Sequence, residues 1–317
     1  MDNLLVRDDI DFDKWMQETE PMARVHDAAV WKHELEEIIK GGNRLTGDRL
    51  PWSKTHELIA FRGGEVTLWA GPNGSGKSLV TSFVQMAFSQ QGAKNCVGSF
   101  EMKPVQTLYR QLRQFSGSSK PTISDNESFL GWMQGNVFIY DHVGAIDKAR
   151  LFAVIRYAAK QLKVHHFWID NLMMCVAGED DYNAQKEFMA SAVSLAIELD
   201  IHIHIIHHVR KAQDEFARQT KYDIKGSGAL TDLVPQIIMV SRNKKKEYEI
   251  QKCNSEGISP SPEIIATPDV FLAVEKQRNG TGWEGNIALW FDPVSQQYRG
   301  APKMQLFKFD REFNHAN

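Results

Sequence analysis

The sequence predicts an α/β protein with a mostly parallel central sheet, helices on both faces and antiparallel strands at its C-terminal edge. Three observations support this fold class. From residue 64 onward, short segments of strand-forming residues alternate with segments of helical length. The segment WAGPNGSGKSLV at 69–80 has the G-x-x-x-x-G-K-[ST] pattern of a phosphate-binding loop between a strand and a helix. The last strand segments follow one another without helices, as antiparallel strands do.

The individual elements follow from apolar periodicity, segment length and turn residues. The Pro-, Ser- and Gly-containing segment 252–268 predicts a surface loop between two late strands. We expect helices at 77–90, 104–116, 146–162 and 183–199, and strands at 65–70, 95–101, 137–141, 165–170, 201–207, 236–242, 270–276 and 286–291.

The chain divides into an N-terminal extension at 1–50, a main domain at 51–300 and a tail at 301–317. Within the extension, DAAVWKHELEEIIKGG predicts an amphipathic helix over 27–40, with an N-cap at Asp27 and glycines at its end. Its apolar stripe consists of Trp31, Leu35 and Ile38. A single amphipathic helix cannot bury its own stripe, so this one docks either on its own core or on a neighbouring subunit.

Composition and charge indicate the cellular setting of the protein and its possible partners. No apolar segment approaches the length of a membrane span, and the acidic N-terminus lacks the basic start and apolar core of a secretory signal. The widely spaced Cys96, Cys175 and Cys253 suggest neither a disulfide framework nor a zinc ribbon, so we expect a cytoplasmic, reducing setting. A net charge of −3 argues against nucleic-acid binding unless basic groups gather locally, as they do at 209–225 and 241–248.

The segment at 69–80 predicts a nucleotide site. A Gly-rich stretch can be a simple turn, but the strand before this one and the helix after it are the context that a phosphate site requires. Lys77 would meet the phosphates and Ser78 would offer its hydroxyl to Mg²⁺. The expected cofactors are ATP, or another nucleoside triphosphate, and Mg²⁺. The loop comprises Gly71, Pro72, Asn73, Gly74, Ser75, Gly76, Lys77 and Ser78.

Three further strand ends supply polar groups at the same edge of the expected sheet. Asp170 ends the segment HHFWID and is the expected partner of the metal; Asn171 follows it, where many P-loop ATPases carry a glutamate. Glu101 therefore becomes the candidate for the water-positioning carboxylate, although it could instead cap the next helix. His208 could contact the γ-phosphate. His202 and His204 are expected to be packed structural histidines, and a metal cluster is the less favoured reading.

The motifs taken in order resemble the DnaB-like replicative helicases, which have a RecA-like P-loop ATPase core. The similarity rests on GPNGSGKS, SFEMKP, FWIDN, IIHHVRK, DIKGSGALTDLVPQIIMVSRNK and VEKQRNGTGWEGNIALWFD, and it covers about residues 55–298. It extends in particular to the helicase domains of phage primase-helicases and of the mitochondrial helicase Twinkle. The zinc-binding front end and the primase domain of such proteins have no counterpart in these residues.

The resemblance implies roles for individual residues. Glu101 matches the catalytic glutamate, Asp170 the metal-associated aspartate and His208 the γ-phosphate sensor of the family. Arg278 matches an arginine finger that reaches a neighbour's nucleotide, and Lys276 lies two residues before it. The base of the nucleotide would lie between two side chains, those of Arg242 and Phe291.

The resemblance also implies a DNA-binding segment at 209–228, a central-channel loop that grips single-stranded DNA by its phosphates. Acidic residues within the segment dilute its charge. The implied protein is an ATP-dependent replicative helicase that assembles as a homo-oligomer, a hexameric ring, with primase, polymerase or loader proteins as further candidate partners and no membrane. The residues expected to contact DNA are Arg210, Lys211, Arg218, Lys221, Lys225 and Gly226.

Two other functions remain open on the sequence. A RecA-like recombination mediator would share the core and the DNA but would form filaments. An ATP-switched regulatory or scaffold protein would hydrolyse ATP without nucleic acid. The channel-loop motif favours the helicase over the recombination mediator. ATPase activity indifferent to single-stranded DNA would be the mark of the regulatory protein.

Overall fold

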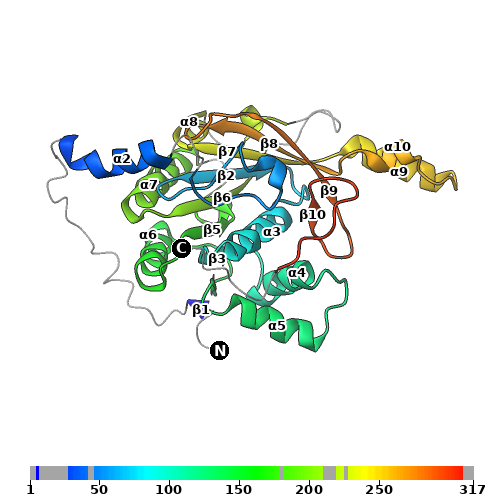
Figure 1. Cartoon of the computed structure of the whole chain (residues 1–317), viewed down its shortest axis with the longest axis horizontal. Helices are drawn as coiled ribbons and strands as arrows, with labels where there is room; N and C mark the ends of the chain where they lie inside the picture. Colours follow the sequence, from blue (N-terminus) through cyan, green and yellow to red (C-terminus); the bar gives the residue numbers. More distant parts are fainter. Residues whose placement is uncertain are drawn as a thin grey trace.

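A computed structural model describes residues 5–6, 28–41, 46–176, 178, 181–209, 219–224 and 228–309. Its centre is one sheet in which β2 (Val66–Gly71) lies between β6 (His202–His208) and β7 (Gln236–Arg242), all parallel. The strand order is β1-β4-β3-β5-β6-β2-β7-β8-β9-β10 (Figure 1). The remaining parallel strands are β1 (Leu5–Val6), β3 (Asn95–Ser99), β4 (Val137–Tyr140) and β5 (His166–Asp170).

The C-terminal strands are antiparallel, as predicted. β8 (Val270–Gln277) runs against β7, β9 (Gly285–Phe291) against β8, and the short β10 (Tyr298–Arg299) against β9. The sheet therefore has a parallel part, whose strands all end at one edge, and an antiparallel extension beside β7.

Helices cover both faces of the sheet because its strands alternate their apolar side chains between two hydrophobic clusters. On β2, Leu68 and Ala70 enter one cluster and Trp69 enters the other. The first cluster receives α6 (Lys148–Tyr157), continued by a π-helical segment Ala158–Leu162, together with α7 (Tyr182–Leu199) and α8 (Gly228–Leu233). The second receives α3 (Lys77–Gln90), α4 (Pro104–Ser116) and α5 (Ile123–Met133).

The eight expected strands and four expected helices are present, with ends that differ by a few residues. The expected loop at 252–268 is wrong in part, because α9 (Lys244–Ser255) extends into it and α10 (Pro262–Ala266) lies within it. Asn243 caps α9 and Ser261 caps α10, and these N-cap signals outweigh the loop-like composition. The helix α5 was not predicted; its start is a capping box of Thr122 and Asp125.

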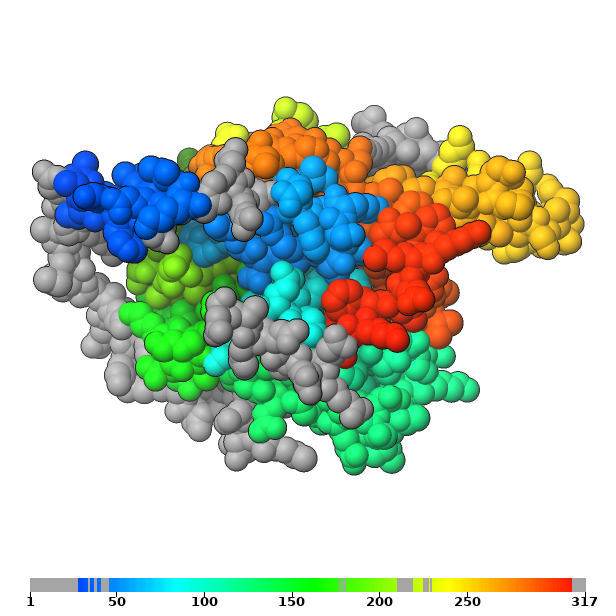
Figure 2. Space-filling view, in the orientation of Figure 1, coloured from blue at the N-terminus to red at the C-terminus, as the bar shows by residue number. Residues whose placement is uncertain are grey.

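Two helical arms project at opposite ends of the molecule (Figures 1 and 2). One consists of α9 and α10, and the other of α2 (Lys32–Gly41) with the 3-10 turn Ala28–Trp31 before it. The predicted helix is thus present over 28–41, whereas its expected N-cap, Asp27, lies outside the described residues. Val30, Trp31, Leu35 and Ile39 are each more than half exposed, and none belongs to the two hydrophobic clusters of the described chain. Of the predicted stripe, Trp31 and Leu35 therefore do not pack on the described core, and the side chain of Ile38 lies outside the described part of the structure.

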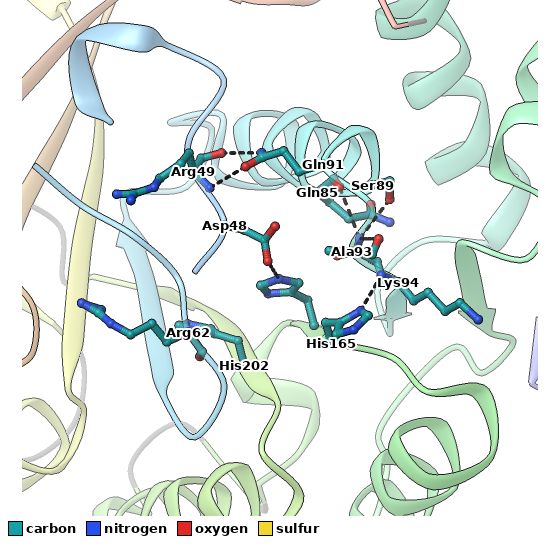
Figure 3. A network of polar contacts seen from close by, with 12 residues as sticks. Asp48, Arg49, Arg62, Gln85, Ser89, Gln91, Ala93, Lys94, His165 and His202 are labelled. Carbon is teal, nitrogen blue, oxygen red and sulfur yellow. Dashed lines mark hydrogen bonds and ion pairs between the residues drawn. The ribbon is translucent and has the colours of Figure 1, made fainter. Parts of the chain in front are cut away.

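The histidines of β5 and β6 have structural roles, as predicted for His202 and His204. Trp69 Nε1 donates to His204 Nδ1 at 3.1 Å, which leaves His204 Nε2 to donate to His166 Nδ1 at 3.0 Å. His166 Nε2 then donates to the Asp48 carboxylate at 2.8 Å. Figure 3 shows Asp48 with the polar contacts around it, near His165 and His202. Burial holds the pKa of His202 and of His204 well below the usual histidine value. Within the described chain, no group of His, Cys, Asp and Glu could hold a metal ion by itself.

Among the helices that the structure describes, none combines the length and the apolar character needed to cross a membrane.

Candidate active site

The parallel strands end around a cavity of about 500 Å³. β2 leads into the phosphate-binding loop, β5 ends at Asp170 and β6 at His208, so their polar groups meet at one edge of the sheet. The structure brings together most of the predicted catalytic and metal-binding residues. Those that line the cavity include Gly74, Gly76, Lys77, Ser78, Glu101, Asp170 and His208.

The loop at 71–78 has the geometry of a phosphate cradle. Gly76 adopts a left-handed φ of 88° at the N-cap of α3, a conformation that glycine tolerates best. Gly71 is required by space, because a Cβ there would lie 2.3 Å from the Val240 carbonyl oxygen. Lys77 Nζ donates to the carbonyls of Gly71 at 2.9 Å and Pro72 at 2.8 Å. The loop thus holds an ammonium beside a helix N-terminus that favours anions.

Burial lowers the pKa of Lys77 to about 8, although the nearby carboxylates of Asp170 and Glu101 act in the opposite direction. Burial raises the pKa of Asp170, and a hydrogen bond from Ser78 opposes that shift. The Ser78 hydroxyl and the Asp170 carboxylate are therefore adjacent oxygen ligands, the donor type that Mg²⁺ prefers. These two residues fit the predicted metal role.

Glu101 does not cap α4, whose N-cap is Lys103 without a side-chain bond. Instead Asn171 Nδ2 lies 2.5 Å from Glu101 Oε1 and 3.0 Å from His208 Nε2. Asn171 is itself buried, and its carbonyl oxygen Oδ1 accepts from the Met173 amide at 2.9 Å. Sequence reasoning noted Asn171 only as a missing glutamate, whereas the structure places it between the candidate catalytic carboxylate and the candidate sensor.

A second residue that sequence reasoning missed is Arg110 on α4, which lines the same cavity. Burial lowers the pKa of its guanidinium, while the nearby Asp170 and Tyr298 act in the opposite direction. The sequence could have indicated Arg110 through the position of α4. This helix begins three residues after Glu101, so one of its arginines can reach the ends of the parallel strands.

A neighbouring cavity of about 390 Å³ contains the two residues predicted to sandwich the base. Arg242 and Phe291 both line it, together with Gly74 and Tyr298. Glu247 holds Arg242 in an ion pair, and Arg242 Nη1 lies 3.4 Å from the Gly74 carbonyl oxygen. The structure therefore brings these two predicted residues to one cavity that borders the phosphate-binding loop.

Lys276 and Arg278 lie elsewhere. Lys276 Nζ donates to the carbonyls of Thr231 at 2.8 Å and Asp232 at 2.9 Å, and Arg278 Nη2 donates to Asp232 O at 2.9 Å. The Arg278 amide bonds to Pro235 O at the start of β7, whereas the base cavity adjoins the end of that strand. The length of β7, about 20 Å, separates Arg278 from the nucleotide cavities of its own chain.

Most of the predicted DNA contacts lie outside the described residues: Arg210, Lys211, Arg218, Lys225 and Gly226. Lys221 is described, in a 3-10 turn over Lys221–Asp223. Its Nζ donates to the Glu275 carbonyl at 2.9 Å, so this ammonium is anchored to β8.

Comparisons with known proteins agree with this architecture. Residues 59–214 match the family model described as an AAA domain. The chain is 23% identical over 227 residues to the DNA helicase/primase of Enterobacteria phage T3, across 63% of this chain and 40% of that protein. The chain thus spans about two-fifths of the length of that relative.

Two solved structures have the same fold. One, described as an ATPase domain, aligns with a TM-score of 0.69 at 16% identity and covers 86% of this chain and 99% of that one. A DnaB-like replicative helicase, described with its interactions with primase, aligns with a TM-score of 0.65 at 17% identity, over 86% of this chain and 67% of that one.

The fold is therefore that of a RecA-like ATPase domain, as predicted. The predicted resemblance to a DnaB-like helicase domain is also confirmed.

Proposed function

We propose that this chain is the ATPase motor of a replicative DNA helicase, which hydrolyses ATP with Mg²⁺, moves along single-stranded DNA and unwinds duplex. One observation supports this most strongly. Lys77, Glu101 and His208 converge on one cavity, while Arg278 lies about 20 Å away at the other edge of the sheet. Such an arrangement suits a site that a second subunit completes.

The polar residues at the strand ends have separate parts in the proposed hydrolysis. Lys77 binds the β- and γ-phosphates, and Glu101 orients and deprotonates the attacking water. Ser78 and Asp170 would hold Mg²⁺, which neutralises phosphate charge when bound. His208 contacts the γ-phosphate, and Asn171 fixes Glu101 and His208 relative to each other through its two contacts.

The same contacts couple hydrolysis to movement. β6 ends at His208, and the chain then enters the proposed DNA-binding segment 209–228. Loss of the γ-phosphate would release His208 and, through Asn171, Glu101. The segment that follows His208 would then shift along the bound strand, with Lys221 among its phosphate contacts.

Assembly into a hexameric ring completes the proposal. Arg278 is exposed and would reach a neighbour's γ-phosphate, with Lys276 beside it. The exposed stripe on α2 would dock on the adjacent subunit and so give the 1–50 extension a role separate from the 51–300 motor. Primase, polymerase or loader proteins are the proposed partners of the ring. The setting is a reducing cytosol, consistent with the free thiols of Cys96, Cys175 and Cys253.

The decisive experiment measures ATP hydrolysis by the full chain with and without single-stranded oligo-dT, and images the same samples by negative stain. Stimulation by DNA together with closed rings supports the helicase. Stimulation with open filaments would indicate a recombination mediator. Hydrolysis indifferent to DNA would indicate an ATP-switched regulator. Lys77→Ala is the negative control, because it removes the ammonium that binds the phosphates, and Lys186→Ala on the exposed face of α7 is its matched control.

A further inference from the structure

Gln296 adopts an unusual backbone conformation. Its φ is +60°, and Lys163 and Asp200 are the other non-glycine residues with positive φ in the described chain. Those two end helices, where a left-handed residue is common. Gln296 instead lies in the turn between β9 and β10. A left-handed glutamine is disfavoured, and such residues persist where the surrounding structure fixes them, often at functional sites.

The turn is held by its own hydrogen bonds. The Gln296 amide donates to Asp292 O at 2.8 Å. The Asp292 carboxylate accepts from the Ser295 amide at 2.9 Å and the Ser295 hydroxyl at 2.7 Å, and it pairs with Arg299 at 2.5 Å. The backbone of Gln296 is therefore fixed before any ligand binds.

The helix α4 also fixes this turn relative to the phosphate-binding loop. Gln114 Nε2 lies 3.0 Å from both Gln296 O and Leu79 O, so one amide joins the turn to the first turn of α3. Arg113 Nη2 donates to two further carbonyls of the turn, Pro293 O and Val294 O, each at 3.1 Å. Because α3 follows the phosphate-binding loop directly, Gln296 is held beside the nucleotide site.

Gln296 lies where the two cavities adjoin. It lines the phosphate cavity, whereas Pro293 and Tyr298 on either side of it line the base cavity. Gly76 and Leu79 line both cavities. In a nucleoside triphosphate, the group that connects the phosphates to the base is the sugar. Within the described chain, the side-chain carboxamide of Gln296 makes no hydrogen bond of its own, and it can both donate to and accept from a hydroxyl.

We propose that Gln296 binds the ribose hydroxyls of the nucleotide and so favours ribonucleotides over deoxyribonucleotides. This inference rests on the proposed nucleotide binding and adds a determinant of nucleotide preference to it. The rigid turn holds the carboxamide in place, so little ordering is needed when the sugar arrives.

The test compares Gln296→Gly with Lys163→Gly in the full chain. Glycine suits both left-handed positions, so each variant loses a side chain without backbone strain, and Lys163 lies outside both cavities. Dissociation constants are measured with ATP, 2′-deoxy-ATP and 3′-deoxy-ATP in Mg²⁺. The wild type and Lys163→Gly should bind at least one deoxy analogue roughly three- to tenfold more weakly than ATP, the effect of one lost hydrogen bond. Gln296→Gly should bind all three equally, with an unchanged or higher thermal midpoint.

The outcomes separate this inference from the proposed function. If Gln296→Gly keeps the wild-type preference for ATP, its side chain does not bind the sugar. If it loses affinity equally for all three nucleotides, the contact is to phosphate, and the inference is also overturned. A wild-type protein that binds ATP without sugar preference overturns the inference alone. A wild-type protein that binds none of the three nucleotides overturns the proposed function as well.

Discussion

The two edges of the parallel sheet differ in how their charged groups are used. At the edge where the strands end, Lys77 and Asp170 are desolvated, their pKa values move away from the usual values, and both face an open cavity. At the opposite edge, Lys276 and Arg278 donate to carbonyl oxygens at the end of α8. One edge thus contains most of the candidate active site, and the other contains two cations that lie outside both nucleotide cavities of the described chain.

Under the proposed assembly, one subunit would contain two half-sites. A neighbour's exposed Arg278 would add a cation near the γ-phosphate at the strand-end edge and stabilise transition-state charge. Arg110 already supplies a cation within the phosphate cavity. Removing Arg278 therefore tests whether Arg110 is sufficient by itself. If Arg110 is sufficient, the opposite edge has only a structural role.

The largest expected effect comes from Arg278→Ala. Removal of an arginine finger lowers turnover by about 10³–10⁵-fold. ATP affinity should persist, because the nucleotide cavities of the same chain are intact. The measurement is steady-state ATP hydrolysis with oligo-dT, alongside nucleotide binding.

Mixing sharpens this prediction. Arg278→Ala subunits retain Glu101, and Glu101→Gln subunits retain Arg278, so a mixture should recover part of the activity that neither protein has alone. Activity of Arg278→Ala near the wild-type level would show that the opposite edge does not complete the site. A mixture as inactive as its components would argue against the two half-sites.

The next effect is that of Glu101→Gln, which removes the proposed general base and keeps its size. Turnover should fall by about 10²–10⁴-fold, the range for general acid–base groups, while ATP binds nearly as before. Rapid-quench and equilibrium binding measurements separate the two quantities. Wild-type turnover in this variant would remove Glu101 from the mechanism.

A smaller effect is expected for Asn171→Ala, since Asn171 holds Glu101 through one charge-assisted hydrogen bond at 2.5 Å. Loss of such a bond corresponds to roughly 10–100-fold in turnover. If Asn171 acts through Glu101, adding Asn171→Ala to Glu101→Gln should cost little more. Additive losses in the double variant would mean that the two residues act separately.

Much of the strand-end edge could be predicted from the sequence. Glu101, Asp170 and His208 each follow an apolar strand, and the ends of parallel strands share an edge. Asn171, Arg110 and Gln296 could not be placed in this way. Asn171 acts through side-chain contacts between strands, Arg110 depends on the rotation of α4, and Gln296 depends on a turn that packing holds in a rare conformation. The roles of Arg278, Lys276 and the α2 stripe depend on a second subunit and stay predictions.

A different measurement concerns the buried histidines near the starts of β5 and β6. The pKa values of His202 and His204 lie well below those of the unfolded chain, near 6.5. Stability is therefore fully present above about pH 6.5 and falls on acidification, by up to roughly 1.4 kcal/mol per pH unit for each ring. The raised pKa values of Asp170 and Glu65 act in the opposite direction.

Urea unfolding at pH 7.5, 6.5 and 5.5 checks this expectation. Wild type and His202→Asn contain the same carboxyl groups. The difference in the pH dependence of their stability therefore reports on the His202 ring alone. The variant should lose less stability between pH 6.5 and 5.5. Equal pH dependence in both proteins would mean that His202 takes up a proton in the folded state.

The smallest expected effect tests whether cations near Lys276 and Arg278 also bind DNA phosphates. Lys221 is bound to Glu275 O. Burial lowers the pKa of Lys276, and the nearby charges of Arg278 and Lys221 lower it further. If Lys221 also contacts one phosphate, Lys221→Ala should reduce the slope of log affinity against log salt by about 0.7 for oligo-dT. Lys221→Arg, which keeps the charge, should leave the slope unchanged, and Lys186→Ala serves as the surface control. The loss should be the same for oligo-dT and oligo-dA, because phosphates carry no sequence information. An unchanged slope in Lys221→Ala, with reduced thermal stability, would mean that Lys221 only anchors its turn to β8.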